Sequence, residues 1–275
     1  MFTEKYGNAT EFYRHVFHDL KDWGFNTLGN YNDEDIPQKI PFVHLFRFVN
    51  ISGYLASWKF REEFSPLPYE YFPDIFSESW REECEKKVAE VQANFRDNQF
   101  LIRRYDSYHL LLGDCYDGNP GIPEFVLQEA RPYVDALSLQ YYQLDPFEEH
   151  FKRIDYWYRI IEKPVIATDS CYAVPKPKMP DPYGPHVSGH RERGLSYRRY
   201  VEALFGRPYG IGWLWCGYID WLQGSGPPGK QVVHLHSGIK DVWESPYKPL
   251  IQAIKRVNAN IYHIATGKKR YEMVQ

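Results

Sequence analysis

The sequence predicts an α/β fold of the (β/α) TIM-type barrel class. Short strand candidates alternate with helical stretches, the strands end on polar residues, and no Gly-rich phosphate loop follows any of them. Alternation of this kind implies a parallel sheet, and the missing phosphate loop disfavours the competing open, doubly wound sheet. At 275 residues the chain suits one such barrel, so we expect a single domain over residues 1–275.

Six short segments have the apolar, β-branched or aromatic character of buried strands. They are residues 24–30, 41–49, 109–114, 136–142, 164–170 and 210–218. Amphipathic helical patterns surround them at 9–22, 77–95, 97–107, 123–131, 147–161, 190–205 and 246–262. Ser77 is a favourable N-cap residue, and Glu78 complements the helix dipole in the turn that follows.

The strand candidates end on polar side chains, as strands do at the active-site face of a barrel. These side chains are Asn30, Asp114, Tyr142, Gln143, Asp169 and Ser170. Alternate residues of a strand share one face. In each of three strands, one face then carries the small or polar side chains. The residues on this face are Ser138, Gln140 and Tyr142 in one strand, Ala167, Asp169 and Cys171 in the next, and Trp213, Trp215 and Gly217 in the last.

Asp169 should therefore point into the barrel mouth, although it ends a run typical of a buried strand. An ionised carboxylate that is buried without partners costs several kcal/mol. We infer that Asp169 has hydrogen-bond partners, a catalytic function, or both.

Charge and hydropathy exclude several classes of partner. A net charge of −3 with 25% charged residues leaves no basic excess, so no nucleic acid is expected. No apolar run approaches the roughly 18 residues of a membrane span, so no membrane partner is expected. The amphipathic start is not a secretory signal, so we expect a cytoplasmic protein as given, with secretion left open if the N-terminus is truncated.

The sequence predicts no cofactor and no metal. Its four cysteines show neither a C-x-x-C pair nor zinc spacing, and we expect free thiols. His234 and His236 have the H-x-H spacing of some barrel metal sites, but there the pair ends the first strand, whereas here it follows the last.

Aromatic residues are unusually frequent, at 17% with 23 Tyr and 8 Trp, and many lie in polar, loop-like segments. They can fill packing gaps. They can also line a surface that binds sugars, because a pyranose ring offers C–H groups on one side and hydroxyls around its edge. Both interpretations stay open at this point.

Five segments, taken in order, resemble a known family. They are LKDWGFNTLGNYND (20–33), YFPDIFSESWREECE (71–85), IRRYDSYHLLLGDCYDG (102–118), PYVDALSLQYY (132–142) and GIGWLWCGYID (210–220). Together they resemble glycoside hydrolase family 50, the β-agarases, and agarase-like relatives. The resemblance implies a TIM barrel that hydrolyses a polysaccharide, such as the galactan agarose, by a retaining two-carboxylate mechanism.

The chain departs from the family in two places. The family's first barrel strand is not found, and VQANFRDNQFLIRRYDSYH (91–109) replaces the fourth strand and its acid/base motif. Six strands remain where eight would close a barrel. Either the barrel is incomplete, or another segment or a second subunit fills the gap, and an open parallel edge makes a homo-oligomer a reasonable expectation.

The resemblance also implies functional residues. In the wider clan an acid/base Glu follows the fourth strand and a nucleophilic Glu follows the seventh, and Asp169 occupies this second position. We expect Asp169 to be nucleophile or base and Asp114 to be the acid, with Asp117 behind it; the alternative is that these carboxylates only cap loops. Asp is one methylene shorter than Glu, which leaves retention or inversion open.

Further side chains are candidates for contact with a polysaccharide or oligosaccharide substrate. They are Asn30, Asp33, Asp117, Gln140, Tyr142, His186, Trp213, Trp215, Tyr218 and Trp221. Two functions are compatible with the sequence. The chain is a glycoside hydrolase, or it is a degenerate agarase-like barrel that binds carbohydrate without cleaving it.

Overall fold

The computed structural model describes residues 2–29, 40–43, 54–59, 71–73, 110–113, 115–118, 121–140, 147–177, 182, 184–222 and 234–268, with six helical residues between 78 and 89. The chain divides into two compact units, Met1–Val43 with Leu110–Gln275, and His44–His109. Single-domain organisation over residues 1–275 stays a prediction.

The smaller unit contains a two-stranded antiparallel sheet of β1 (Tyr54–Lys59) and β2 (Tyr71–Pro73). The sequence pattern did not predict β1. Residues 78, 81–82, 85–86 and 89 are helical, within the helix expected at 77–95. Arg81 and Glu85 form an ion pair one turn apart, with Nε and Oε1 separated by 3.4 Å.

The larger unit is built on a parallel sheet with the strand order β3-β4-β5-β6. Its strands are β3 (Tyr116–Asp117), β4 (Leu137–Gln140), β5 (Val165–Ser170) and β6 (Gly210–Trp215). The α/β class with a parallel sheet is thus confirmed. Within the described part of the chain this sheet is open, with four strands, while the predicted strands at 24–30 and 41–49 meet only at an isolated parallel bridge between Leu28 and Phe42.

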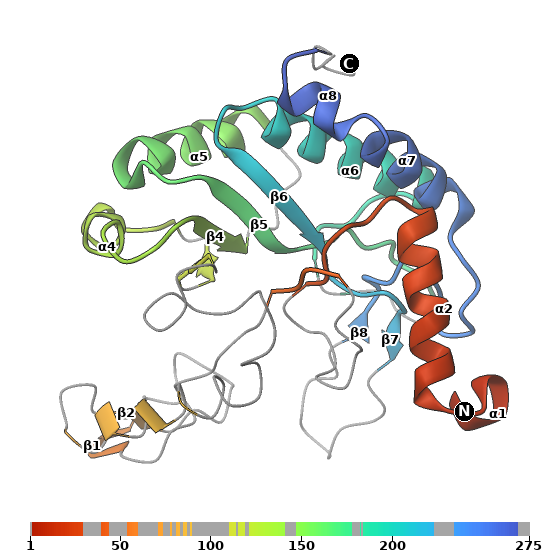
Figure 1. Cartoon of the computed structure of the whole chain (residues 1–275), viewed down its shortest axis with the longest axis horizontal. Coiled ribbons are helices and arrows are strands. Elements are labelled where there is room, and N and C mark those ends of the chain that lie inside the picture. Colours follow the sequence, from red (N-terminus) through yellow and green to blue (C-terminus); the bar gives the residue numbers. More distant parts are fainter. Residues whose placement is uncertain are drawn as a thin grey trace. The chain divides into compact units, whose positions relative to one another are not determined.

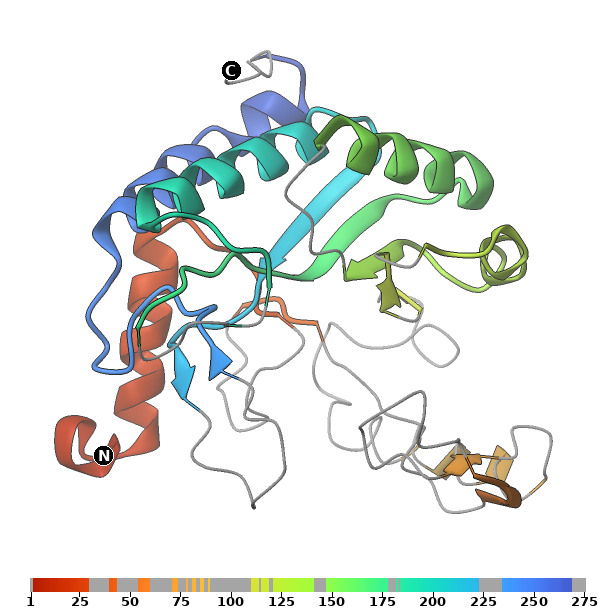
Figure 2. The ribbon, with the colours of Figure 1, turned by 180° about the vertical axis from the view of Figure 1, so that it is seen from behind.

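Helices lie along one face of this sheet in both views (Figures 1 and 2). The helices of the unit are α1 (Phe2–Tyr6), α2 (Ala9–Asp22), α4 (Glu124–Ala130), α5 (Phe147–Ile161), α6 (His190–Phe205), α7 (Lys248–Asn258) and α8 (Ile261–Ala265). An antiparallel pair, β7 (Trp221–Leu222) and β8 (His234–Leu235), lies between β6 and α7 in sequence. Among the helices described, none is long and apolar enough to cross a membrane.

The hydrophobic core lies between the sheet and these helices. Ile154 and Ile161 of α5, Leu204 of α6, and Leu139 and Val165 of the sheet are all fully buried. Fully burying an aliphatic side chain of this size contributes about 1.5–3 kcal/mol. The helical spacing of the α5 residues therefore places them on the side of the helix that packs in the core.

A close helix contact holds α6 against α7. A Cβ at Gly194 would lie 2.7 Å from Cβ of Ala253 and 3.4 Å from the carbonyl oxygen of Pro249. Neither neighbour is the end of a flexible side chain, so a larger residue must separate the helices.

We predict that Gly194→Leu lowers the free energy of unfolding by roughly 1–3 kcal/mol, because overpacking forces the α6–α7 contact apart. The measurement is urea denaturation followed by far-UV circular dichroism. Gly189→Ala is the control, since a Cβ there meets nothing within 4 Å. Equal unfolding midpoints for the two variants would contradict the described packing.

Candidate functional site

A β-bulge near the end of β5 decides where Asp169 points. Ala167 pairs with Leu139 of β4, but the next pair is Asp169 with Gln140, so Thr168 is skipped. A bulge places an additional residue in one strand and breaks the alternation of its side chains. Thr168 and Asp169 can therefore face the same side although they are consecutive.

Side-chain contacts show that Thr168 and Asp169 do face the same side. The hydroxyl oxygens of Thr168 and Ser138 lie 2.7 Å apart, and Nε2 of Gln140 donates to Oδ2 of Asp169 over 2.9 Å. Ser138 and Gln140 share one face of β4, so both β5 side chains lie on that face. Asp169 is only 4% exposed, and the amide of Gln140 compensates part of the cost of burying its carboxylate.

The bulge also separates Asp169 from the tryptophans of β6. Trp213 pairs with Ala167, and the next pair is Ser170 with Trp215. Without the bulge Asp169 would pair with Trp215 and share its face, which is what simple alternation predicts. The structure therefore differs from the sequence expectation at this point, and the extra residue in β5 is the reason.

Both tryptophans instead face α6. The centroid of the Trp213 ring lies 5.0 Å from that of Tyr197 and 6.4 Å from that of Tyr200. The Trp215 ring lies 5.8 Å from Tyr197. Trp213 and Trp215 are thus part of the packing between β6 and α6, and their predicted contact with substrate stays a prediction.

Three polar residues stand in register at the carboxyl-terminal end of the sheet, and we call them the carboxylate row. Asp117 of β3 pairs with Gln140 of β4, which pairs with Asp169 of β5. Adjacent strands are about 4.8 Å apart, so the backbones of the two aspartates are separated by about 10 Å. Asp117 is exposed and Asp169 is buried.

Cysteine residues lie next to Thr168, Asp169 and Ser170. Sγ of Cys115 lies 3.1 Å from Oγ1 of Thr168, and the backbone N–H of Cys216 donates to the Ser170 carbonyl over 2.9 Å. A hydrogen bond with Cys171, burial, and the charge of Asp169 together raise the pKa of the Cys216 thiol. This thiol therefore stays protonated, as expected of the free cysteine the sequence predicts.

The other predicted binding residues are dispersed. His186 is exposed in the loop after β5, where Nε2 lies 2.7 Å from the Pro182 carbonyl oxygen. Tyr218 stacks on Trp23, the C-cap residue of α2, at 5.9 Å, and its hydroxyl accepts from Lys240 over 2.7 Å. Of Trp221 only the backbone is described, and four predicted residues lie outside the described ranges: Asn30, Asp33, Asp114 and Tyr142.

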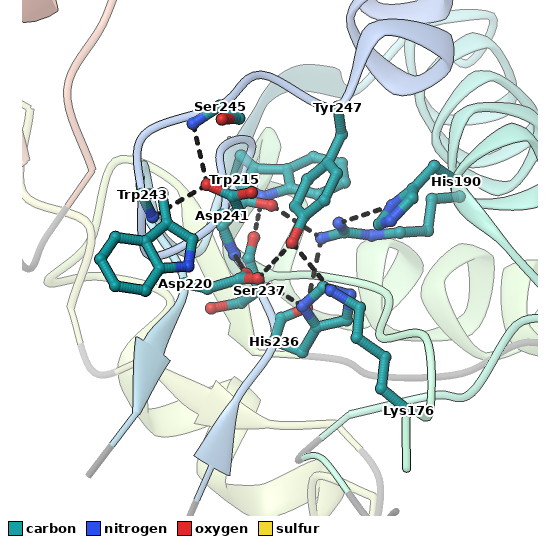
Figure 3. Close-up of polar contacts among 12 residues, drawn as sticks. Lys176, His190, Trp215, Asp220, His236, Ser237, Asp241, Trp243, Ser245 and Tyr247 are labelled. Carbon is teal, nitrogen blue, oxygen red and sulfur yellow. Dashed lines mark hydrogen bonds and ion pairs between the residues drawn. The ribbon is translucent and has the colours of Figure 1, made fainter. Parts of the chain in front are cut away.

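A second polar network, partly buried, was not predicted (Figure 3). We call it the Asp220 cluster, and it consists of Lys176, His190, Arg193, Asp220, His236 and Tyr247. Its members come from the loop after β5, the first turn of α6, and the segments after β6 and β8, so they span 176–247 in sequence. The H-x-H pair at 234 and 236 was the one local signal.

Asp220 is the centre of the cluster. It accepts from Nδ1 of His236 at 2.5 Å, from the Tyr247 hydroxyl at 2.6 Å and from the Gly238 N–H at 2.9 Å. A carboxylate can only accept, so Nδ1 of His236 carries the proton. Position 238 accommodates only glycine, because a Cβ there would lie 2.1 Å from the backbone nitrogen of Asp220.

Arg193 supplies the buried positive charge of the cluster. It is 0% exposed, and it donates to the carbonyl oxygens of His236 and Gly238 over 3.3 and 3.1 Å. Its guanidinium also lies over the rings of Trp215 and Tyr247, at 5.3 and 5.6 Å. Burial lowers the pKa of Arg193 to about 10, which leaves the side chain charged at neutral pH.

Both histidines of the cluster are neutral at pH 7. Burial, followed by the charge of Arg193, lowers the pKa of His190 to about 4, and its ring stacks on Tyr247 at 3.7 Å. Burial also lowers the pKa of His236, outweighing its hydrogen bond with Asp220. Among the described residues no group of three or more His, Cys, Asp or Glu side chains could hold a metal ion.

Comparison with known proteins agrees with the sequence motifs. No protein-family model matches the chain. Over 190 residues it is 24% identical to Beta-agarase B from Vibrio sp. (strain JT0107), an alignment that covers 66% of this chain and 19% of that protein. The chain resembles a β-agarase in sequence. The resemblance to glycoside hydrolase family 50 that the motifs indicated is therefore confirmed.

Solved structures extend the likeness to the fold. The chain is similar to an exo-beta-agarase with a TM-score of 0.73 and 16% identity, over 96% of this chain and 50% of that one. It is similar to an agarase, AgWH50C, with a TM-score of 0.71 and 18% identity, over 96% and 51%. The agarase-like chain thus spans about half of these structures and about a fifth of the curated relative.

We predict that stability falls as the pH drops from about 6.5 to about 4, and that His190→Gln makes this dependence shallower. The folded-state pKa of His190 is depressed, so the unfolded chain takes up the proton first, and stability that is complete above pH 6.5 is lost below it. The measurement is urea denaturation across this pH range. His263→Gln, at an exposed histidine of α8, should keep the wild-type slope. Equal slopes for wild type and His190→Gln would contradict the described burial.

Proposed function

We propose that the agarase-like chain hydrolyses a glycosidic bond in a galactan such as agarose. The observation that carries this proposal is the carboxylate row at the carboxyl-terminal end of a parallel sheet, the edge where ligands bind in α/β folds. The similarity to Beta-agarase B supports the substrate class. We further propose that the four-stranded sheet is part of a TIM-type barrel completed by other residues or by a second copy.

Asp169 is the proposed nucleophile or base. Gln140 donates to its Oδ2, so one oxygen is held in place by the amide while the carboxylate stays an acceptor. A held carboxylate can attack the anomeric carbon or take a proton from water. Gln140 is a positioning residue in this scheme.

Asp117 and Asp114 are the proposed acids. Carboxyl groups lie about 5–5.5 Å apart in retaining glycosidases and about 6.5–9.5 Å apart in inverting ones. A backbone separation of about 10 Å between Asp117 and Asp169 is compatible with the longer range. We therefore propose an inverting displacement, with water activated by Asp169 and the leaving oxygen protonated by Asp117, or by Asp114 from the same segment.

The second candidate is a protein that binds a saccharide without cleaving it. The 4% exposure of Asp169 favours it, because a base must reach water or substrate. The two candidates differ in product formation and not in binding.

We predict that Asp169→Asn lowers reducing-sugar release from agarose by about 100-fold or more, since removal of a general base costs roughly 10²–10⁴ in rate. Asp117→Asn and Asp114→Asn, assayed in parallel, identify the acid. Glu129→Gln, at an exposed residue of α4, is the control and should leave the rate unchanged. Wild-type activity in Asp169→Asn would refute the assignment. Wild-type binding without release of reducing sugar on any galactan would leave the second candidate.

A further inference from the structure

Trp243 is the most exposed of the large hydrophobic side chains that the structure describes. It leaves 77% of its surface accessible, whereas Trp23 and Trp157 are 4% and 3% exposed. An indole kept in water forgoes the stabilisation that its burial would contribute. Neither the carboxylate row nor the Asp220 cluster uses the Trp243 side chain, which leaves its indole accessible to a ligand.

The turn that carries Trp243 is rigid. Oδ1 of Asp241 accepts from the N–H groups of Trp243 and Ser245 over 2.9 and 2.8 Å. The Asp241 N–H donates to the Ser245 carbonyl, and the Glu244 N–H donates to the Asp241 carbonyl, over 3.0 and 2.8 Å. Glu244 adopts a φ of 63°, which non-glycine residues rarely adopt unless their surroundings hold them there.

The same turn is tied to polar and aromatic groups of α1 and α2. The carboxylate of Glu244 accepts from the Tyr6 hydroxyl and pairs with Nζ of Lys5 at 3.0 Å. The Tyr6 ring in turn contacts Phe12 of α2, with centroids 5.3 Å apart. Trp243 is thus the chain neighbour of a residue, Glu244, that contacts Lys5 and Tyr6, and we call Trp243, Glu244, Lys5, Tyr6 and Phe12 the Trp243 platform.

In Figure 3 the Trp243 indole lies on the side of the Asp241 turn away from His190 and His236. The indole thus points away from the Asp220 cluster, and the hydrogen bonds of the Asp241 turn hold the backbone of Trp243. Holding the ring in place before binding removes part of the ordering entropy that a ligand would otherwise have to overcome.

We propose that the Trp243 platform is a binding surface for a neutral polysaccharide. The indole offers a flat apolar face to the C–H side of a pyranose, and Nζ of Lys5, whose side chain is 52% exposed, offers a donor to its hydroxyls. The charges of Lys5 and Glu244 cancel, so the surface favours an uncharged polymer over a sulfated one. This inference rests on the proposed function, because it names the same substrate class and gives it a second contact.

The test is affinity electrophoresis of the full chain in native gels with and without dissolved low-melting agarose. We expect agarose to retard the wild type, Trp243→Ala to weaken binding by about tenfold or more, and Trp243→Phe to retain part of it. Tyr262→Ala removes another exposed aromatic residue, 68% exposed on α8, and should match the wild type. Urea denaturation checks that the variants fold equally.

A second assay separates this proposal from the proposed hydrolysis. Release of reducing sugar from a soluble galactan tetrasaccharide should be the same for wild type and Trp243→Ala, because a short substrate does not need the platform. Retardation that depends on Trp243, without hydrolysis by either protein, keeps the platform and refutes the hydrolase. Hydrolysis together with equal retardation of wild type and Trp243→Ala, or no retardation of the wild type, refutes the platform. A Trp243-dependent dimer in gel filtration with no retardation also refutes it and assigns the surface to a second copy.

Discussion

The hydrogen bond from Gln140 to Asp169 is the interaction on which the candidate site depends, and the β5 bulge makes it possible. One skipped residue, Thr168, turns Asp169 from the side of the β6 tryptophans to the side of the β4 amide. The same step aligns Asp169 with Asp117 across three strands. A small change in register thus decides whether the carboxylate packs under a helix or joins a row of polar groups.

The Asp220 cluster links several segments of the larger unit. Asp220, Arg193 and Tyr247 join the segment after β6 to the starts of α6 and α7 through buried hydrogen bonds. Removing Asp220 or Arg193 would leave the opposite buried charge without compensation, which is far more costly than the intact network. The cluster also includes Tyr247, which follows the turn from which Trp243 projects.

Local pattern predicted local structure well. The helices expected at 9–22, 147–161 and 190–205 match α2, α5 and α6, because their apolar spacing is set by residues within each segment. The bulge could not be predicted, since it is defined by pairing with other strands. The Asp220 cluster could not be predicted either, because its members are far apart in sequence and only tertiary packing brings them together.

The most direct test of this account is a double-mutant cycle between Gln140 and Asp169. Unfolding free energies would be measured by urea denaturation for wild type, Gln140→Leu, Asp169→Ala and the double variant. The account predicts a coupling energy of about 1.5–3 kcal/mol, the value typical of a hydrogen bond to a charged group. Effects that add to within about 0.5 kcal/mol would mean that the two side chains do not interact, and that Asp169 does not face the β4 amide.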